Sequence, residues 1–149
     1  MRAFVTCAAT WFGTGLSPFA PGTVGTLGAI PFYLVLARLP LSLYLVTTVA
    51  FIFLAAWISE RAEEEFGAKD PGKIVIDEVA GYLVTMAGAP VGWAGVLAGF
   101  FLFRFFDVVK VPPARFFDRR VKTGWGVVLD DVVAGLYACA VLHLLLRLL

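Results

Sequence analysis

Charged side chains are scarce in this sequence. Asp, Glu, Lys and Arg make up 15% of its 149 residues, whereas hydrophobic residues make up 60%. A soluble domain has about 25% charged and roughly 45–50% apolar residues, so this chain has too few charges to cover a water-facing surface. We therefore expect an integral membrane protein. The length allows a single domain over residues 1–149. About four to six helices of roughly 20 residues fit in it, which predicts an all-α, polytopic membrane helical bundle.

Cysteine, histidine and net charge are also low. Cys7 and Cys139 lie in apolar stretches and form no CxxC pair, so no disulfide framework is expected. The only histidine, His143, lies near the end of the last apolar run. The net charge of +1 gives no overall field to attract nucleic acid. Residues 1–12 lack the layout of a cleaved secretory signal, so we expect them to remain as a first membrane segment.

Runs without charge divide the first half of the chain into segments. Glycine and proline interrupt residues 13–28, which predicts a loop. A helix is expected over 23–37, with Thr23 as its hydroxyl cap. The run 41–59 is long enough to span a membrane and continues as an acidic helical end closed by Gly67.

The second half shows the same alternation. Residues 79–103 carry no charge, and glycine and proline within 88–92 divide them into two shorter helices. Charges then recur at intervals of three, which places them along one side of a helix. These residues are Arg104, Asp107 and Lys110. A basic loop over 115–122, closed by Gly124 and Gly126, precedes a last apolar segment over 127–149.

If each apolar segment crosses the membrane once, three polar blocks of the sequence lie on the same membrane face. These blocks are residues 13–28, 60–78 and 104–131. The segments 23–37 and 79–89 are short for a full crossing, so we expect them to be tilted or half-spanning. Nine of the twelve Lys and Arg residues lie between positions 61 and 122, so the positive-inside bias makes the common face cytoplasmic.

Five carboxylates border long apolar runs. They are Asp77, Glu78, Asp107, Asp130 and Asp131. An ionised carboxylate costs a few kcal/mol at membrane depth, and it persists there when it is paired, protonated or bound to a cation. Adjacent acids repel each other, which favours a cation. With the histidine at the far end of the last helix, only oxygen ligands remain, and these suit Mg²⁺, which also accepts phosphate oxygens. We therefore expect a Mg²⁺ site that handles a phosphate.

The segment over 13–28 predicts the complementary phosphate-binding groups. Its glycines let backbone N–H groups approach a ligand, and the positive end of the following helix would face an anion. Basic side chains from the later blocks would neutralise the remaining charge. The candidate substrate-binding residues are Thr14, Pro21, Gly22, Thr23, Arg104, Lys110 and Lys122.

Missing motifs exclude several phosphatase mechanisms. A cysteine nucleophile of the CxxxxxR type would need arginine at position 13 or 145, where Gly13 and Leu145 stand, and no DxDx motif occurs. A histidine nucleophile would need His143, which is expected on the opposite face. Metal-activated water, or attack by a carboxylate, remains.

The acids alone would also suit a cation path, so a small membrane cation carrier or channel subunit is the alternative. A carrier needs polar residues that continue to both faces, whereas the far half of each segment is almost wholly apolar. A CDP-alcohol phosphotransferase would need a DxxDG block, which does not occur.

Four ordered blocks resemble the phosphatidylglycerophosphatase A family. They are GTGLSP and APGTVG within 13–25, DP followed by IVIDE within 70–78, FRFFD with Lys110 and Pro113 within 103–113, and DRRVK followed by LDDVVAG within 118–135. The resemblance covers about residues 10–138. Two positions, Val111 and Thr123, depart from the family pattern.

The resemblance implies a multi-pass enzyme of the bacterial cytoplasmic membrane. It would remove the terminal phosphate from phosphatidylglycerophosphate, in phospholipid biosynthesis, with Mg²⁺ required. Combined with the residues above, it makes Asp77, Glu78, Asp107 and Asp131 the expected Mg²⁺ ligands. Asp77, Asp130 and Asp131 are the expected catalytic residues, with Asp130 either a further ligand or the base. The diacylglycerol tail would lie in the lipid between helices, and the sequence does not define an oligomeric state.

Overall fold

The chain folds as a bundle of helices. A computed structural model describes residues 1–68, 71–112 and 123–149, and these residues form helices and turns without strands. The elements are α1 (Arg2–Ala9), the 3₁₀ helix η1 (Thr14–Leu16), α2 (Pro21–Leu36), α3 (Leu41–Phe66), α4 (Ile76–Thr85), α5 (Trp93–Val109) and α7 (Gly124–Leu148). The expectation of an all-α fold is confirmed.

Two helices are long and apolar enough to cross a membrane. They are α3, with 26 residues, and α7, with 25. At a rise of about 1.5 Å per residue, each exceeds the roughly 30 Å of a bilayer core. Helix α2 has 16 residues and α4 only 10, so α4 is far too short to cross. Helix α1, with 8 residues, is also too short to be the membrane segment expected at residues 1–12. The number of membrane crossings remains a prediction.

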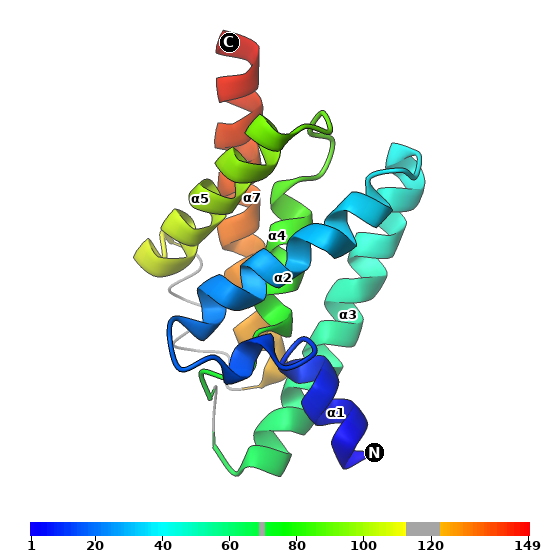
Figure 1. Cartoon of the computed structure of the whole chain (residues 1–149), viewed down its shortest axis with the longest axis vertical. Coiled ribbons are helices and arrows are strands. Elements are labelled where there is room, and N and C mark those ends of the chain that lie inside the picture. The colour runs from blue at the N-terminus through cyan, green and yellow to red at the C-terminus, as the bar shows by residue number, and fades with distance from the viewer. Residues whose placement is uncertain (69–70, 113–122) are drawn as a thin grey trace.

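Several segment boundaries agree with the charge pattern. Helix α3 continues from its apolar part through the acidic end and stops at Gly67, whose φ of 65° is left-handed. Helices α4 and α5 are separate, as the glycine and proline residues within 88–92 predict. Figure 1 shows the turn between α2 and α3, the turn between α4 and α5, and the C-terminus all towards the upper part of the molecule.

The predicted loop over 13–28 is wrong beyond residue 20, whereas the helix expected over 23–37 is confirmed as α2. Helix α2 begins at Pro21, and Ala20, with a left-handed φ of 42°, takes the cap position that was expected for Thr23. The glycines of this segment allow close packing within a helix instead of a loop. A Cβ added at Gly25 would lie 2.6 Å from the Cβ of Val75, so α2 could not approach Val75 with a larger residue there.

The glycines expected to close the basic loop are also helical. Gly124 and Gly126 lie in the first turn of α7. A Cβ at Gly124 would lie 2.4 Å from the carbonyl oxygen of Ala56, so this glycine brings the start of α7 against α3. The sequence pattern identified small residues correctly but could not distinguish a turn from a close helix contact.

Helix α4 lies in the centre of the bundle and contacts α2, α3, α5 and α7 (Figure 1). Its most extensive contact is with α7. A Cβ at Gly135 would lie 2.5 Å from the carbonyl oxygen of Gly81, and a Cβ at Gly81 would lie 2.8 Å from that of Asp131. The two glycines therefore let the backbones touch, which is how small residues join membrane helices. This crossing sets the first turn of α4 beside Asp131.

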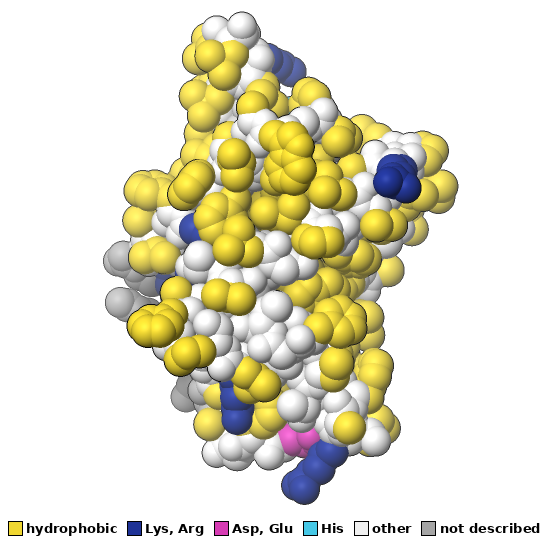
Figure 2. Space-filling model, viewed as in Figure 1, with side chains coloured by type: hydrophobic (Ala, Val, Ile, Leu, Met, Phe, Trp, Pro, Cys, Tyr) yellow, Lys and Arg dark blue, Asp and Glu magenta, His cyan; other side chains and the backbone are white. Residues whose placement is uncertain are grey.

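Large apolar side chains cover much of the exterior. Figure 2 shows hydrophobic side chains over most of one face, with Lys and Arg at separate places on it. On α3, the exposed side chains include Leu43, Val46, Val49 and Phe53. An exposed apolar surface of this extent is typical of a protein that lies in lipid.

Candidate functional site

Two acidic residues begin the central helix. Asp77 and Glu78 occupy the first turn of α4, where the positive end of the helix dipole favours carboxylates. Asp77 is buried, and the Glu78 side chain is 14% exposed. Burial raises the pKa of Asp77, and burial together with the neighbouring Asp77 charge raises the pKa of Glu78 well above its usual value. The charged forms of both groups thus require a compensating positive charge.

A third carboxylate arrives from α7. One oxygen atom from each of Asp77, Glu78 and Asp131 lies within 4.8 Å of the other two. Asp77 Oδ1 and Glu78 Oε2 are buried and have no hydrogen-bond partner among the described residues. Buried carboxylate oxygens that face one another without donors are costly unless a cation or protons separate them. The set contains only hard oxygen donors, so it fits Mg²⁺.

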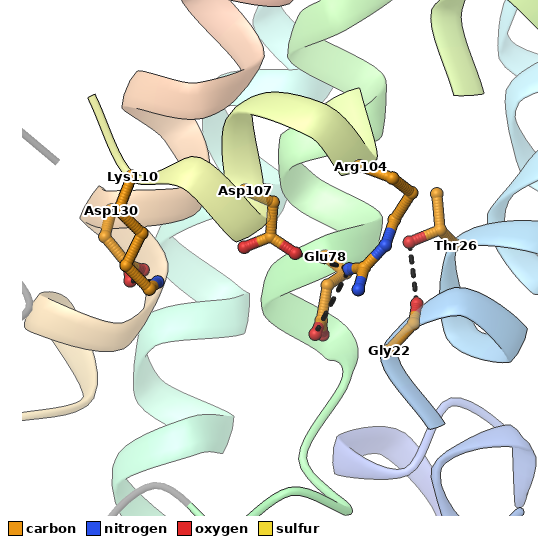
Figure 3. Close-up of polar contacts among 7 residues, drawn as sticks. All are labelled: Gly22, Thr26, Glu78, Arg104, Asp107, Lys110 and Asp130. Carbon is orange, nitrogen blue, oxygen red and sulfur yellow. Dashed lines mark hydrogen bonds and ion pairs between the residues drawn. The ribbon is translucent and has the colours of Figure 1, made fainter. Parts of the chain in front are cut away.

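Two cation–carboxylate pairs lie near this triad, and Figure 3 shows both pairs with Glu78. Arg104 of α5 pairs with Asp107, three residues later on the same helix, and its Nη1 lies 4.0 Å from Glu78 Oε1. Lys110 Nζ lies 2.6 Å from Asp130 Oδ2. Arg104, Asp107 and Lys110 therefore lie together, as their spacing predicts, although Lys110 follows the last residue of α5.

The Lys110 ammonium is held as a cation. Burial alone would lower the pKa of Lys110, but the hydrogen bond to Asp130 and the charge of Asp130 raise it, and the net pKa is above its usual value. The side chain is 33% exposed, so part of it is accessible from outside. The backbone of Lys110 is left-handed, with a φ of 51°.

The N-terminus of α2 meets the Glu78–Arg104 pair. A Cβ at Gly22 would lie 2.8 Å from Glu78 Oε1 and 3.1 Å from Arg104 Nη1, so a larger residue there would displace the ends of these two side chains. Pro21 occupies the first turn, and the N–H groups of Gly22 and Thr23 have no acceptor within a helix at these positions. These N–H groups and the helix dipole supply positive charge beside the arginine. Figure 3 shows Gly22 and Arg104 next to each other.

Two predicted substrate-binding residues are not among these contacts. The hydroxyl of Thr14 donates to the carbonyl oxygens of Thr10 and Trp11, so it is used within its own turn. Lys122 lies outside the described residues. The other five predicted residues, and all five carboxylates, belong to the first turns of α2 and α4, the end of α5 and the start of α7.

The sequence reasoning missed Tyr137. Its hydroxyl donates to the carbonyl oxygen of Pro112, two residues after Lys110, and its ring stacks on Phe106. A signal was available, because Tyr137 follows Asp130 by seven residues and so lies on the same side of α7. No motif pointed to it.

Most buried hydroxyl groups elsewhere in the described part of the bundle donate hydrogen bonds to backbone carbonyl oxygens. Tyr44 donates to the carbonyl oxygen of Leu83, and Tyr82 donates to that of Val96. The described residues hold one cluster of three or more potential metal ligands, formed by Asp77, Glu78 and Asp131. This arrangement supports one site at a fixed place over a series of cation sites along a path.

Comparison with known proteins gives consistent matches. The family model of phosphatidylglycerophosphatase A matches residues 7–146. The phosphatidylglycerophosphatase A of Escherichia coli is 40% identical over 136 residues, which are 91% of this chain and 79% of that protein. The phosphatidylglycerophosphatase A of Haemophilus influenzae is 38% identical over 135 residues, 89% of this chain and 83% of that protein.

A third relative has another name. A protein from Bacteroides thetaiotaomicron with the provisional name phosphatidylinositol-3-phosphatase is 40% identical over 138 residues, 87% of this chain and 85% of that protein. No solved structure matches the chain significantly.

Proposed function

The chain belongs to the phosphatidylglycerophosphatase A family, and from this premise we propose that it hydrolyses phosphatidylglycerophosphate to phosphatidylglycerol and phosphate. Members of this family are lipid phosphate hydrolases, so the protein is an enzyme of phospholipid metabolism. The observation that carries the proposed mechanism is the triad of Asp77, Glu78 and Asp131, in which Asp77 Oδ1 and Glu78 Oε2 have no hydrogen-bond partner among the described residues. The side chains of Arg104 and Lys110 pair with the neighbouring carboxylates Asp107 and Asp130.

The triad would hold the cofactor. Asp77, Glu78 and Asp131 are the proposed ligands of Mg²⁺, because they offer three hard oxygens around one point. When bound, Mg²⁺ would offset the charge of the phosphate and acidify a water molecule. This proposal differs from the sequence-based prediction at Asp107, because that carboxylate pairs with Arg104.

The cationic groups would bind the phosphate. Arg104 and Lys110, with the N–H groups of Gly22 and Thr23, surround the carboxylates from two sides. Asp107 would orient Arg104, and Asp130 would orient Lys110. Charge-assisted hydrogen bonds of this kind are roughly twice as strong as neutral ones, and they become stronger as charge develops on the phosphoryl oxygens.

The reaction we propose is a direct hydrolysis. The oxygen of water forms a bond to phosphorus, and the bond between phosphorus and the glycerol oxygen breaks. One proton of water passes to Asp130, and the other remains on the released phosphate. The glycerol oxygen takes up a proton from solvent as it leaves, and Asp130 then returns its proton to solvent. A loose transition state needs little help from a base, so binding and charge compensation would supply most of the acceleration.

The apolar exterior would place the site in the membrane. Helices α3 and α7 have the length to cross it, and the diacylglycerol tail of the substrate would remain in the surrounding lipid. The concentration of Lys and Arg between residues 61 and 122 favours a site that faces the cytoplasm. We propose a multi-pass protein of the bacterial cytoplasmic membrane on this basis.

Phosphate release by the purified protein in mixed micelles tests the proposal. We expect release from phosphatidylglycerophosphate with Mg²⁺, and loss of release in EDTA that Mg²⁺ restores. Phosphatidylinositol 3-phosphate is the second candidate substrate, because of the name of the Bacteroides relative. A higher kcat/KM on that lipid would replace the proposed substrate, and full activity in EDTA would remove the metal from the mechanism.

A further inference from the structure

Tyr137 holds the chain on both sides of Lys110. Its ring stacks on Phe106, with ring centres 5.6 Å apart and planes 19° apart. Its hydroxyl donates to the carbonyl oxygen of Pro112. Phe106 precedes Lys110 by one helical turn and Pro112 follows it by two residues. One side chain of α7 therefore fixes the exit of α5 at two points.

Lys110, between these two points, has a backbone that needs such support. It is left-handed, with a φ of 51°, and its N–H donates to the carbonyl oxygen of Phe106 at 3.0 Å. This conformation is unfavourable for a non-glycine residue, and it persists where the surroundings fix it. A relaxed backbone at Lys110 would direct its side chain elsewhere.

The fixed backbone determines where the ammonium lies. Lys110 Nζ reaches Asp130 Oδ2 at 2.6 Å, and Asp130 adjoins Asp131 of the triad. Asp130 and Tyr137 are two turns apart on the same side of α7. Two contacts from this side of α7 therefore hold the segment, one at the backbone of Pro112 and one at the ammonium of Lys110.

We propose that Tyr137 is a positioning residue that sets Lys110 for phosphate binding. The inference rests on the proposed function, because it assigns Lys110 to the phosphoryl oxygens. Tyr137 does not touch the substrate. Its effect on the reaction is transmitted through the backbone at Lys110.

A double-mutant cycle between Tyr137→Phe and Lys110→Gln tests this proposal. Tyr137→Phe keeps the ring stack and removes the hydrogen bond to Pro112, so we expect KM for phosphatidylglycerophosphate to rise about 3- to 10-fold with kcat within about twofold. In the Lys110→Gln background, Tyr137→Phe should change KM by less than about twofold. An equal rise in both backgrounds, or no rise in the wild type, would overturn the proposal.

Tyr44→Phe is the matched control. It also removes a tyrosine hydrogen bond to a backbone carbonyl, that of Leu83, but away from the carboxylates. We expect it to lower the melting temperature and leave KM unchanged. A purely structural role for Tyr137 predicts the same pattern for Tyr137→Phe.

The proposal and the proposed function can fail separately. If the wild type releases no phosphate from phosphatidylglycerophosphate, the proposed function fails. The double-mutant cycle is then repeated with the Kd of inorganic phosphate as the measured quantity. Calorimetry with Mg²⁺ present gives this Kd without any turnover. A weaker Kd in Tyr137→Phe that disappears in the Lys110→Gln background supports the positioning role, and a weakening that persists there contradicts it.

Discussion

Gly22 lies where the first turn of α2 meets the Glu78–Arg104 pair. The first turn of α2 lies against the ends of the Glu78 and Arg104 side chains, and a Cβ at residue 22 would push these ends out of their present positions. Its glycine was predicted to bind substrate as part of a loop, and the structure places it in a helix beside the carboxylates. The sequence carries the small residue but not the partner that requires it, because that partner is more than fifty residues away.

Gly22→Ala should lower kcat/KM by about 10-fold or more. The new methyl group would lie 2.8 Å from Glu78 Oε1, so either the carboxylate or α2 must shift, and shifts of about 1 Å near reacting groups cost up to 100-fold. Phosphate release gives the measurement. Gly72→Ala is the control, because a Cβ there meets nothing within 4 Å. Unchanged kinetics in Gly22→Ala would show that this contact has no role in the reaction.

Asp107→Asn distinguishes two roles for this carboxylate. If Asp107 acts as the partner of Arg104, the substitution should raise KM for the lipid about 3- to 10-fold, while the Mg²⁺ concentration for half-maximal activity stays within about twofold. If Asp107 is a metal ligand, as the sequence predicted, the substitution would instead raise that Mg²⁺ concentration by about 10-fold or more. Titration of activity with Mg²⁺ at saturating lipid therefore decides between the roles.

At the scale of helices, the crossing of α4 and α7 positions the site. Gly81 and Gly135 let the two backbones touch, and this places Asp77 and Glu78 near Asp131. The extents of α3, α4 and α5 could be predicted from charge-free runs and from glycine and proline. The start of α2 was also predicted, to within two residues. The crossing could not be predicted, because glycine favours both turns and close helix contacts, and only the packed partner distinguishes them.

Gly135→Ala should destabilise the protein by about 1–3 kcal/mol, because the added methyl group would lie 2.5 Å from the carbonyl oxygen of Gly81 and neither backbone can yield cheaply. Thermal unfolding in detergent measures this as a lower melting temperature, again with Gly72→Ala as the control. A melting temperature equal to that of the wild type would mean that α4 and α7 do not pack as the structure has them.

For the whole molecule, charge scarcity was the most informative sequence feature. It predicted that three distant polar blocks share one end of the bundle, and the structure brings the carboxylates of two of these blocks, Asp77, Glu78, Asp107, Asp130 and Asp131, together with Arg104 and Lys110. The pairing of Arg104 with Asp107 also follows from their spacing of three. The pairing of Lys110 with Asp130 does not, because it depends on how α5 ends against α7.

Membrane orientation gives a prediction at this scale. In a variant without Cys7 and Cys139, a single cysteine replaces either Glu64, at the end of α3, or Arg38, in the turn before it. In intact spheroplasts, a membrane-impermeant maleimide should label Arg38→Cys and should label Glu64→Cys only after permeabilisation. The reverse pattern would place the carboxylates on the outer side and contradict the proposed cytoplasmic site.

Binding of Mn²⁺, a paramagnetic substitute for Mg²⁺, tests most directly whether three carboxylates from α4 and α7 hold a divalent ion. Electron paramagnetic resonance of the purified protein reports the free Mn²⁺ signal as protein is added. The account predicts that the wild type and Glu64→Gln, an exposed carboxylate changed in the same way, bind Mn²⁺, and that Asp77→Asn and Asp131→Asn bind it at least about 10-fold more weakly. Equal affinity in all four proteins would contradict it.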